Sequence, residues 1–333
     1  MDYIRIETLY SGEIKRTNAN LSKVYDNKIL LKEKIRKVGK DVLDNPKIIK
    51  GKKILVKPNW VIHDQKNDDE ICLRTHDNFL ISTLEILLEN GPSSIMIGDA
   101  PIQGCNWEIL CSNQLLKSIS DLSQSHTIPI IIKDFRRSTF DNSRNKPIKD
   151  RNPISDYLIF NLGKESYLEP ISSMDPIFRV TKYNPDRLAE SHTIGKHKYC
   201  ITKELFETDI VLSLPKIKTH QKTGITGALK NIVGLNGDKD YLPHHRIGGD
   251  QIGGDCYPGK SYLRFTSEKI LDIANRNQSE RLYWIWYWLA AVLWRLSFPK
   301  KVHSLAAGWY GNDTCWRMVM DLNKIAVFGK KDG

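Results

Sequence analysis

Residues 214–234, LPKIKTHQKTGITGALKNIVG, bring together side chains that bind anions and transfer protons. The stretch contains Lys216, Lys218, Lys222, Lys230 and His220, and it has no acidic residue. Lysine ammonium groups bind phosphate and carboxylate as point charges, and histidine exchanges protons near neutral pH. The stretch therefore predicts an anion-binding site with His220 as its acid or base. A solvated basic surface loop is the alternative interpretation.

The same stretch predicts a helix that begins at Thr223 and Gly224, directly after the lysine-rich loop, and closes at Gly234 or Gly237. Free N–H groups and the positive end of the helix dipole favour an anion at such a start. The sequence GITGALKN lacks the GxxxxGK[ST] spacing, so this is not a P-loop.

A second polar cluster follows in residues 236–255, NGDKDYLPHHRIGGDQIGGD. His244 and His245 could transfer protons, or bind a divalent metal together with His220 or Asp99. Arg246 adds a further anion-binding group. The spacing matches no standard metal signature, and a polar loop in which one histidine caps a helix or packs is the alternative.

The elements that must position these residues alternate along the chain. Apolar runs at 52–60, 93–101, 127–135 and 209–216 predict strands, and 78–91, 113–126 and 201–209 predict helices. This order is typical of an α/β protein with a Rossmann-like, mostly parallel sheet. Residues 136–200 predict an inserted β-rich segment, with short strands at 157–163, 166–171 and 177–183. We expect a single domain over residues 1–333.

The ends of the predicted strands gather polar residues. In open parallel sheets, ligands bind beyond the carboxyl ends of the strands. We therefore expect one edge of the sheet to carry Lys57, Asn59, Asp99, Lys216, Lys218 and His220. In this arrangement Lys57 and Asn59 bind the anion and Asp99 joins the histidines in proton transfer or metal binding.

Residues 281–301, RLYWIWYWLAAVLWRLSFPKK, predict a tryptophan-rich carboxyl-terminal helix. Its uninterrupted apolar run, 282–294, is shorter than the roughly 20 residues that span a bilayer. An interfacial helix explains the composition better, because aromatic rings suit the headgroup zone and basic residues suit anionic lipids. The membrane-contacting candidates are Trp284, Trp286, Trp288, Trp294 and Arg295. A core helix or a dimer face is the alternative.

Composition narrows the class of protein. The 333 residues carry a formal charge of +11, which favours anionic partners. The six cysteines form no CxxC pair, so no iron–sulfur cluster is expected. The charged amino terminus has no apolar core typical of a secretory signal, so we expect a cytoplasmic protein, with peripheral contact at the inner membrane face. Nucleic acid is not an expected partner, because the basic residues form local loops and no nucleic-acid motif is present.

The chain resembles the family called domain of unknown function 362. The features that carry the resemblance are Lys57-Pro58-Asn59, Gly98-Asp99 and the block Leu214–Gly234, extended by LPHHRIGG and GNDTCWRMVMDLNKI. The resemblance covers about residues 50–328. It implies a role near surface-glycan (polysaccharide) biosynthesis, and it implies that the chain is truncated at its carboxyl end, because members usually continue further.

Two functions remain open from the sequence. The first is an enzyme, of unknown reaction class, that acts on an anionic small molecule such as a phosphorylated sugar or glycan precursor. The second is a non-catalytic module that docks on an anionic membrane or a partner through the tryptophan-rich helix.

Overall fold

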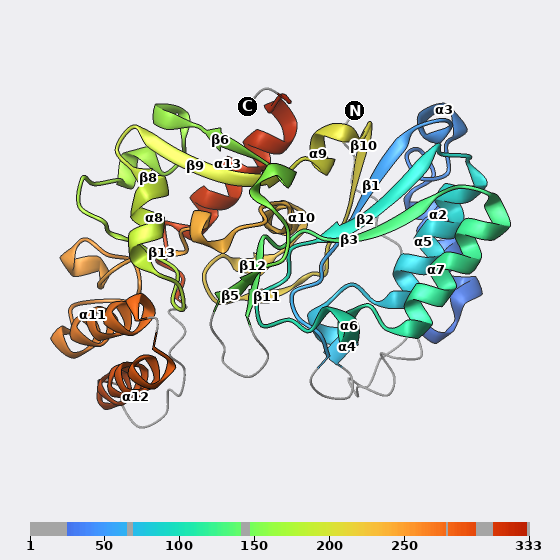
Figure 1. Ribbon diagram of the computed structural model, residues 1–333. Helices are drawn as coiled ribbons and strands as arrows, with labels where there is room; N and C mark the ends of the chain where they lie inside the picture. Colours follow the sequence, from blue (N-terminus) through green and yellow to red (C-terminus); the bar gives the residue numbers. More distant parts are fainter. Residues whose placement is uncertain (1–24, 65–68, 141–146, 278, 298–308, 332–333) are drawn as a thin grey trace. The chain divides into compact units, whose positions relative to one another are not determined.

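The computed structural model describes residues 25–64, 69–140, 147–277, 279–297 and 309–331 (Figure 1). The chain divides into two compact units. Unit 1 comprises residues 1–149 and 204–216, and unit 2 comprises residues 150–203 and 217–333. The prediction of a single domain stays a prediction, because compactness does not test whether either unit folds alone.

Unit 1 is built on a parallel sheet with the strand order β10–β1–β2–β3 (Figure 1). Its strands are β1 (Lys53–Pro58), β2 (Ser94–Asp99), β3 (Ile130–Asp134) and β10 (Ile210–Leu214). All three pairings are parallel, which confirms the predicted sheet. β10 comes after residues 150–203, which belong to unit 2, so the fourth strand of the sheet is added only when the chain returns to unit 1.

Helices α2, α5 and α7 pack on one side of this sheet (Figure 1). The helices of unit 1 are α2 (Lys28–Val38), α3 (Pro46–Ile49), α4 (Asp69–Leu73), α5 (Asp77–Glu89), α6 (Trp107–Leu110), α7 (Asn113–His126) and α9 (Glu204–Glu207). Several of them begin at side-chain caps; for example, His76 Nδ1 accepts the Asn78 N–H, and Ser112 Oγ accepts the Leu115 N–H. A short pair, β4 (Ser138–Phe140) and β5 (Pro147–Asp150), follows β3.

The core of unit 1 lies between the sheet and these helices. Ile54 and Val56 on β1 and Ile97 on β2 are fully buried, and they pack with Leu84 and Leu87 of α5. The apolar side chains at i, i+3 spacing on α5 and those at alternate positions of the strands therefore pack into the same apolar layer.

Unit 2 contains small antiparallel sheets. Its strands are β6 (Tyr157–Asn161), β7 (Phe178–Arg179), β8 (His192–Thr193), β9 (Lys196–Thr202), β11 (Lys218–His220), β12 (Gly224–Thr226) and β13 (His245–Arg246). They pair as β6–β9–β8, β13–β7 and β11–β12. The predicted β-rich character of the inserted segment is thus confirmed. The strand predicted at 166–171 is wrong, since residues 169–171 form a 3-10 turn (η3, Glu169–Ile171). Pro170 has no backbone N–H to donate to a neighbouring strand.

The helices of unit 2 are α8 (Pro185–Ser191), α10 (Ala228–Asn231), α11 (Tyr262–Arg276), α12 (Glu280–Leu296) and α13 (Cys315–Phe328). The remaining 3-10 turns are η1 (Ile154–Asp156), η2 (Gly163–Glu165), η4 (Ile232–Leu235), η5 (Lys239–Tyr241) and η6 (Asp250–Ile252). α11 and α12 lie side by side as a helical hairpin (Figure 1).

The helix predicted from Thr223 is wrong. Residues 218–226 form a β-hairpin, in which β11 and β12 pair antiparallel, and α10 begins only at Ala228. Gly224 has a φ of 72° and Gly227 is extended, and both conformations are incompatible with helix. The β-branched Thr219, Ile225 and Thr226 favour strands here. There is therefore no helix start at Thr223–Gly224 to bind an anion.

The predicted tryptophan-rich helix corresponds to α12, which ends at Leu296, and residues 298–308 lie outside the described part of the chain. Tyr283, Trp284, Tyr287 and Trp288 form a chain of ring contacts along it, with centroids 5.2–6.0 Å apart. No helix within the described ranges has both the length and the apolar character that a bilayer span requires.

Candidate functional site

In unit 1, the carboxyl edge of the sheet holds a buried ion pair. Lys57 Nζ lies 2.8 Å from Asp99 Oδ1 and donates to the Pro58 carbonyl. The other oxygen of Asp99 accepts the Trp60 N–H at 2.6 Å. Both charged side chains are almost fully buried. Lys57 and Asp99 therefore neutralise each other and tie the ends of β1 and β2 together.

Two other predicted residues lie at this edge. Asn59 is buried, and its backbone N–H donates to Thr75 Oγ1, which itself donates to the Leu214 carbonyl. Lys216 follows β10, and its Nζ lies 3.1 Å from the Tyr25 hydroxyl. Lys218 and His220 belong to unit 2, so the structure does not place them at the edge of the unit 1 sheet.

In unit 2, the β11–β12 hairpin fixes the orientation of His220. Its Nδ1 accepts the backbone N–H groups of Lys222 and Thr223, at 3.1 and 3.2 Å. The neutral ring therefore carries its proton on Nε2. Burial, with the positive charges of Lys230, Lys222 and Lys218, lowers the pKa of His220 to about 4. At neutral pH His220 is thus an uncharged donor surrounded by cations.

His244 has the opposite tautomer. Its Nδ1 lies 2.6 Å from the Leu242 carbonyl and must donate to it, which leaves a lone pair on Nε2. Burial, helped by Lys230 and Lys222, lowers its pKa well below the usual value. Neither Nε2 of His220 nor that of His244 has a hydrogen-bond partner among the described residues, and neither is a fully buried atom.

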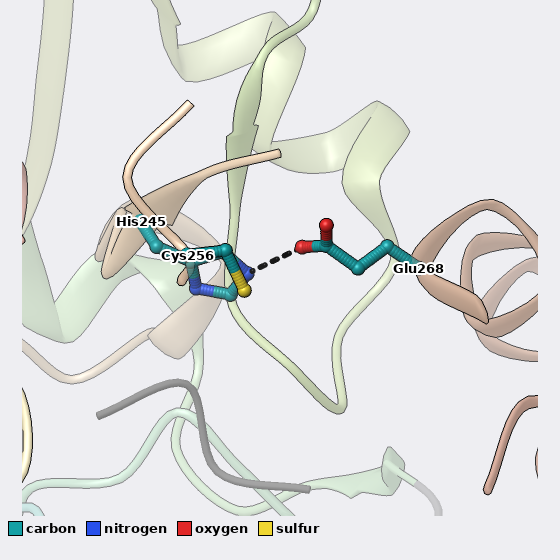
Figure 2. A group of neighbouring side chains, drawn as sticks. All are labelled: His245, Cys256 and Glu268. Atoms are coloured by element: carbon teal, nitrogen blue, oxygen red, sulfur yellow. Dashed lines mark ion pairs between the residues drawn. The ribbon is translucent and has the colours of Figure 1, made fainter. Parts of the chain in front are cut away.

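His245 lies between a lysine and a glutamate, of which Figure 2 shows the glutamate. Lys222 Nζ is 2.7 Å from its Nδ1, and Glu268 Oε1 is 3.5 Å from its Nε2. Within the described residues no carboxylate forms an ion pair with Lys222, and burial lowers its pKa. Burial raises the pKa of Glu268 to about 7. Glu268 Oε1 is buried and makes no hydrogen bond, whereas Oε2 accepts the Gly248 N–H.

Cys256 completes this group. Its Sγ, a ring nitrogen of His245 and a carboxylate oxygen of Glu268 all lie within 4.8 Å of one another, and all three residues are buried (Figure 2). The residues come from three segments: β13, the glycine-rich loop after it, and α11. Burial beside Glu268 raises the pKa of the Cys256 thiol well above its usual value.

The glycine-rich loop is held by Asp255. This fully buried carboxylate accepts the N–H groups of Arg246 and Asp313 and the hydroxyl of Thr314. The loop leaves no space at Gly254, where a Cβ would lie 2.1 Å from the Gly248 carbonyl oxygen. These contacts fix the position of Cys256, the residue after Asp255.

A pocket in unit 2 reaches the cluster. Its lining includes Arg179, His245, Cys256, Glu268, Asp272 and Trp294. Arg179 and Asp272 form a buried ion pair, with Nε 2.9 Å from Oδ1, so the charges of these two lining residues balance each other.

The structure brings together only part of the predicted site. His220, His244, Lys218 and Lys230 gather around the hairpin, and His245 lies next to them through Lys222. Thr223 and Gly224 lie on that hairpin, and Arg246 is bound to Asp255, 3.6 Å away.

Sequence reasoning missed Cys256 and Glu268, and it named Lys222 without placing it in the site. Glu268 carried a signal: it follows Phe265 and precedes Leu271 at helical spacing, so an acid stands on the apolar face of α11. Cys256 follows the second GGD of the loop and carried no comparable signal.

The chain matches the family model described as a domain of unknown function (DUF362) over residues 161–328. The chain therefore belongs to this family. The matched range contains every residue of the cluster in unit 2 and the whole of β10 from unit 1. No curated protein and no solved structure matches the chain.

Proposed function

We propose that the protein is an enzyme acting on an anionic small molecule, which binds at the β11–β12 hairpin of unit 2. One observation carries the proposal. Lys222 and Lys230 direct positive charge at two neutral histidines, and among the described residues neither lysine forms an ion pair. Concentrated positive charge without a counter-ion is stable when a ligand supplies the negative charge.

The two histidines give the site its chemistry. His220 presents an N–H and His244 presents a lone pair, because backbone groups hold the opposite nitrogen of each ring. Such a pair can donate a hydrogen bond or proton to one substrate atom and accept one from another. The substrates that we propose are phosphorylated sugars and glycan precursors. The proposal places the protein in the cytoplasm and does not include nucleic acid among its partners.

Calorimetric titration with inorganic phosphate, pyrophosphate and glucose 1-phosphate tests the binding step. We expect Lys230→Gln to weaken binding about tenfold or more, because a hydrogen bond to a charged group contributes roughly 1.5–3 kcal/mol. Lys164→Gln, an exposed lysine on η2, is the matched control and leaves affinity unchanged. Failure of the wild-type chain to bind any of the three would contradict the proposal.

Turnover separates an enzyme from a binding protein. Phosphorus NMR of the wild-type chain with a panel of sugar phosphates should detect a product that His220→Gln forms at least about a hundredfold more slowly. Equal rates for the two proteins would remove His220 from the chemistry, even if phosphate still binds.

A second candidate function rests on α12. Its solvent-exposed face carries the apolar side chains of Leu282, Ile285, Trp288, Leu289, Val292 and Leu296. Exposed Arg281 and Arg295 stand at its two ends. We propose that this face docks on an anionic bilayer, at the inner membrane face, since apolar contact between flanking cations suits the headgroup region.

The tryptophans contribute unequally to this face. Trp288 is 59% exposed, Trp284 and Trp286 are partly buried, and Trp294 packs inside against Tyr257. Co-sedimentation with phosphatidylserine vesicles should therefore depend on Trp288 and not on Trp294. Binding of Trp288→Ser and Ile285→Ser equal to that of the wild-type chain would exclude docking through this face.

A further inference from the structure

His245, Cys256 and Glu268 have the composition of a transition-metal site. Imidazole, thiolate and carboxylate are the three ligand types that zinc takes in proteins, and three protein ligands with one open position are typical of catalytic zinc. The three residues come from separate segments and still place their ligand atoms within 4.8 Å. The pocket reaches the same three side chains, so an open position has access from it.

One of the three spacings also fits a tetrahedral ion. Bonds of about 2.0–2.3 Å at tetrahedral angles separate two ligand atoms by roughly 3.3–3.8 Å. His245 Nε2 and Glu268 Oε1 lie 3.5 Å apart, inside this range and too far apart for a good hydrogen bond (Figure 2). The distance therefore suits two ligands that share a metal, as well as an ion pair without one.

An orphaned atom points to a ligand independently. Glu268 is only 7% exposed, and its Oε1 is buried without a hydrogen-bond partner. Its neighbours are His245 Nε2, 3.5 Å away, and the Cys256 thiol, and neither compensates its lost hydration as fully as a bound ligand would. The oxygen is directed at His245, where a cation would satisfy it.

The surrounding groups already orient the ligands. Glu268 Oε2 accepts the Gly248 N–H, and His245 Nδ1 is engaged by Lys222. These contacts leave Oε1 and Nε2 directed into the cluster. Asp255, through its backbone and hydroxyl contacts, holds the loop that delivers Cys256.

We propose that His245 Nε2, Cys256 Sγ and a Glu268 carboxylate oxygen bind one divalent transition-metal ion, zinc by ligand type, with the fourth position open to the pocket. Binding releases the protons of the Cys256 thiol and of His245 Nε2, and Lys222 passes a proton to Nδ1, so that the ring stays a neutral imidazole and the lysine becomes an amine that accepts the Nδ1–H. The inference goes beyond the proposed function, because metal binding here needs neither an anionic substrate nor Lys230.

Cobalt substitution tests the site directly. The full-length chain, treated with chelator and titrated with Co²⁺, should bind one ion per chain and show a thiolate-to-cobalt charge-transfer band. Cys256→Ser should lose this band and bind Zn²⁺ at least about a hundredfold more weakly, since even outer-contact changes cost 10–100-fold. Cys315→Ser, a second buried free cysteine, is the matched control and keeps the band.

Further measurements separate loss of the metal site from misfolding and from loss of the anion site. Glu268→Gln, in which the side chain keeps its size, should weaken Zn²⁺ at least about tenfold, while Lys230→Gln should keep the cobalt spectrum. Cys256→Ser should still bind phosphate, because the proposed anion site at the β11–β12 hairpin does not use the Cys256 thiol. Absence of stoichiometric Co²⁺ binding by the wild-type chain, or a charge-transfer band that survives in Cys256→Ser, overturns the metal site.

Discussion

Two lysines, one in each unit, occupy contrasting environments. Lys57 in unit 1 is fully buried and lies 2.8 Å from the Asp99 carboxylate. Lys222 in unit 2 contacts a histidine ring and, among the described residues, forms no ion pair. The difference teaches that the position of the counter-charge, and not the lysine itself, separates a lysine held in a buried ion pair from one that we propose to lie at a ligand site.

The same contrast extends to the carboxylates. Both oxygens of Asp99 have partners, Lys57 and the Trp60 N–H. Glu268 has one satisfied oxygen and one buried oxygen without a hydrogen bond. We therefore expect substitutions at the unit 1 edge to change stability and substitutions in the unit 2 cluster to change binding.

The largest expected effect comes from breaking the closed pair. Lys57→Met leaves the Asp99 charge buried without its cation, which costs about 3–5 kcal/mol of unfolding free energy. Urea unfolding followed by circular dichroism measures it. Lys53→Met, on the exposed start of β1, should cost less than about 0.5 kcal/mol. Equal losses of unfolding free energy in the two variants would show that the Lys57–Asp99 ion pair does not stabilise unit 1.

A smaller effect is expected at the loop that delivers Cys256. In Gly254→Ala the new Cβ lies 2.1 Å from the Gly248 carbonyl oxygen, so the loop must shift, at about 1–3 kcal/mol. Co²⁺ affinity should fall at least about tenfold with it. Gly227→Ala is the control, because a Cβ there meets nothing within 4 Å and its φ is −138°. Unchanged cobalt binding in Gly254→Ala would separate the loop from the site.

Acid should destabilise unit 2 through a buried histidine pair. His192 Nδ1 lies 3.3 Å from His197 Nδ1, and its Nε2 contacts the Tyr241 carbonyl. The charges that face the pair are Lys196 and, on the His197 side, Glu169 and Asp321. Burial, with the charge of His197, lowers the pKa of His192 to about 3.

The sign of the pH effect follows from proton binding. Below about pH 6.5 the unfolded chain protonates His192 and the folded chain does not, so stability is lost as pH falls from about 6.5 to about 3. The slope approaches 1.4 kcal/mol per pH unit for this one group. His192→Gln should flatten the curve by that amount in urea unfolding series. An unchanged slope would contradict the assignment.

The smallest effects should be alike in the two units. Ser112 Oγ accepts the Leu115 N–H at the start of α7, and Ser261 Oγ accepts the Arg264 N–H at the start of α11. Each serine-to-alanine change should cost about 1 kcal/mol. Thermal unfolding measures the two losses of stability. If they are equal, the helix caps of the two units contribute alike, and the units differ in how their buried charges are compensated. A loss confined to one unit would point to unequal local stability instead.

Much of unit 1 was predictable because its signals are local. The strands at 53–58, 94–99, 130–134 and 210–214 are apolar runs, and α5 and α7 show apolar residues at helical spacing between them. Parallel pairing followed from this alternation, since a helix between two neighbouring strands returns the chain to the edge of the sheet where the first strand began. The meeting of Lys57, Asn59 and Asp99 at one edge followed in turn.

The segment 223–234 shows where local reasoning failed. Its apolar spacing resembles a helix, but Gly224 and Gly227 adopt conformations that end one, and Thr226 pairs with Lys218 across the hairpin. Strand pairing is a contact between distant residues, so helical periodicity in one window does not detect it.

The sequence by itself determined the alternation of elements, the positive charge, the lysine and histidine composition of 214–234 and the membership of the family. Only the tertiary structure decided which charges are compensated. The ion pair of Lys57 and the meeting of His245, Cys256 and Glu268 join residues from different segments of the chain. The tautomers of His220 and His244 depend on nearby backbone groups whose positions the folded hairpin and loop set. Electrostatic and coordination chemistry act over a few ångströms in space, and the order of residues does not fix those distances.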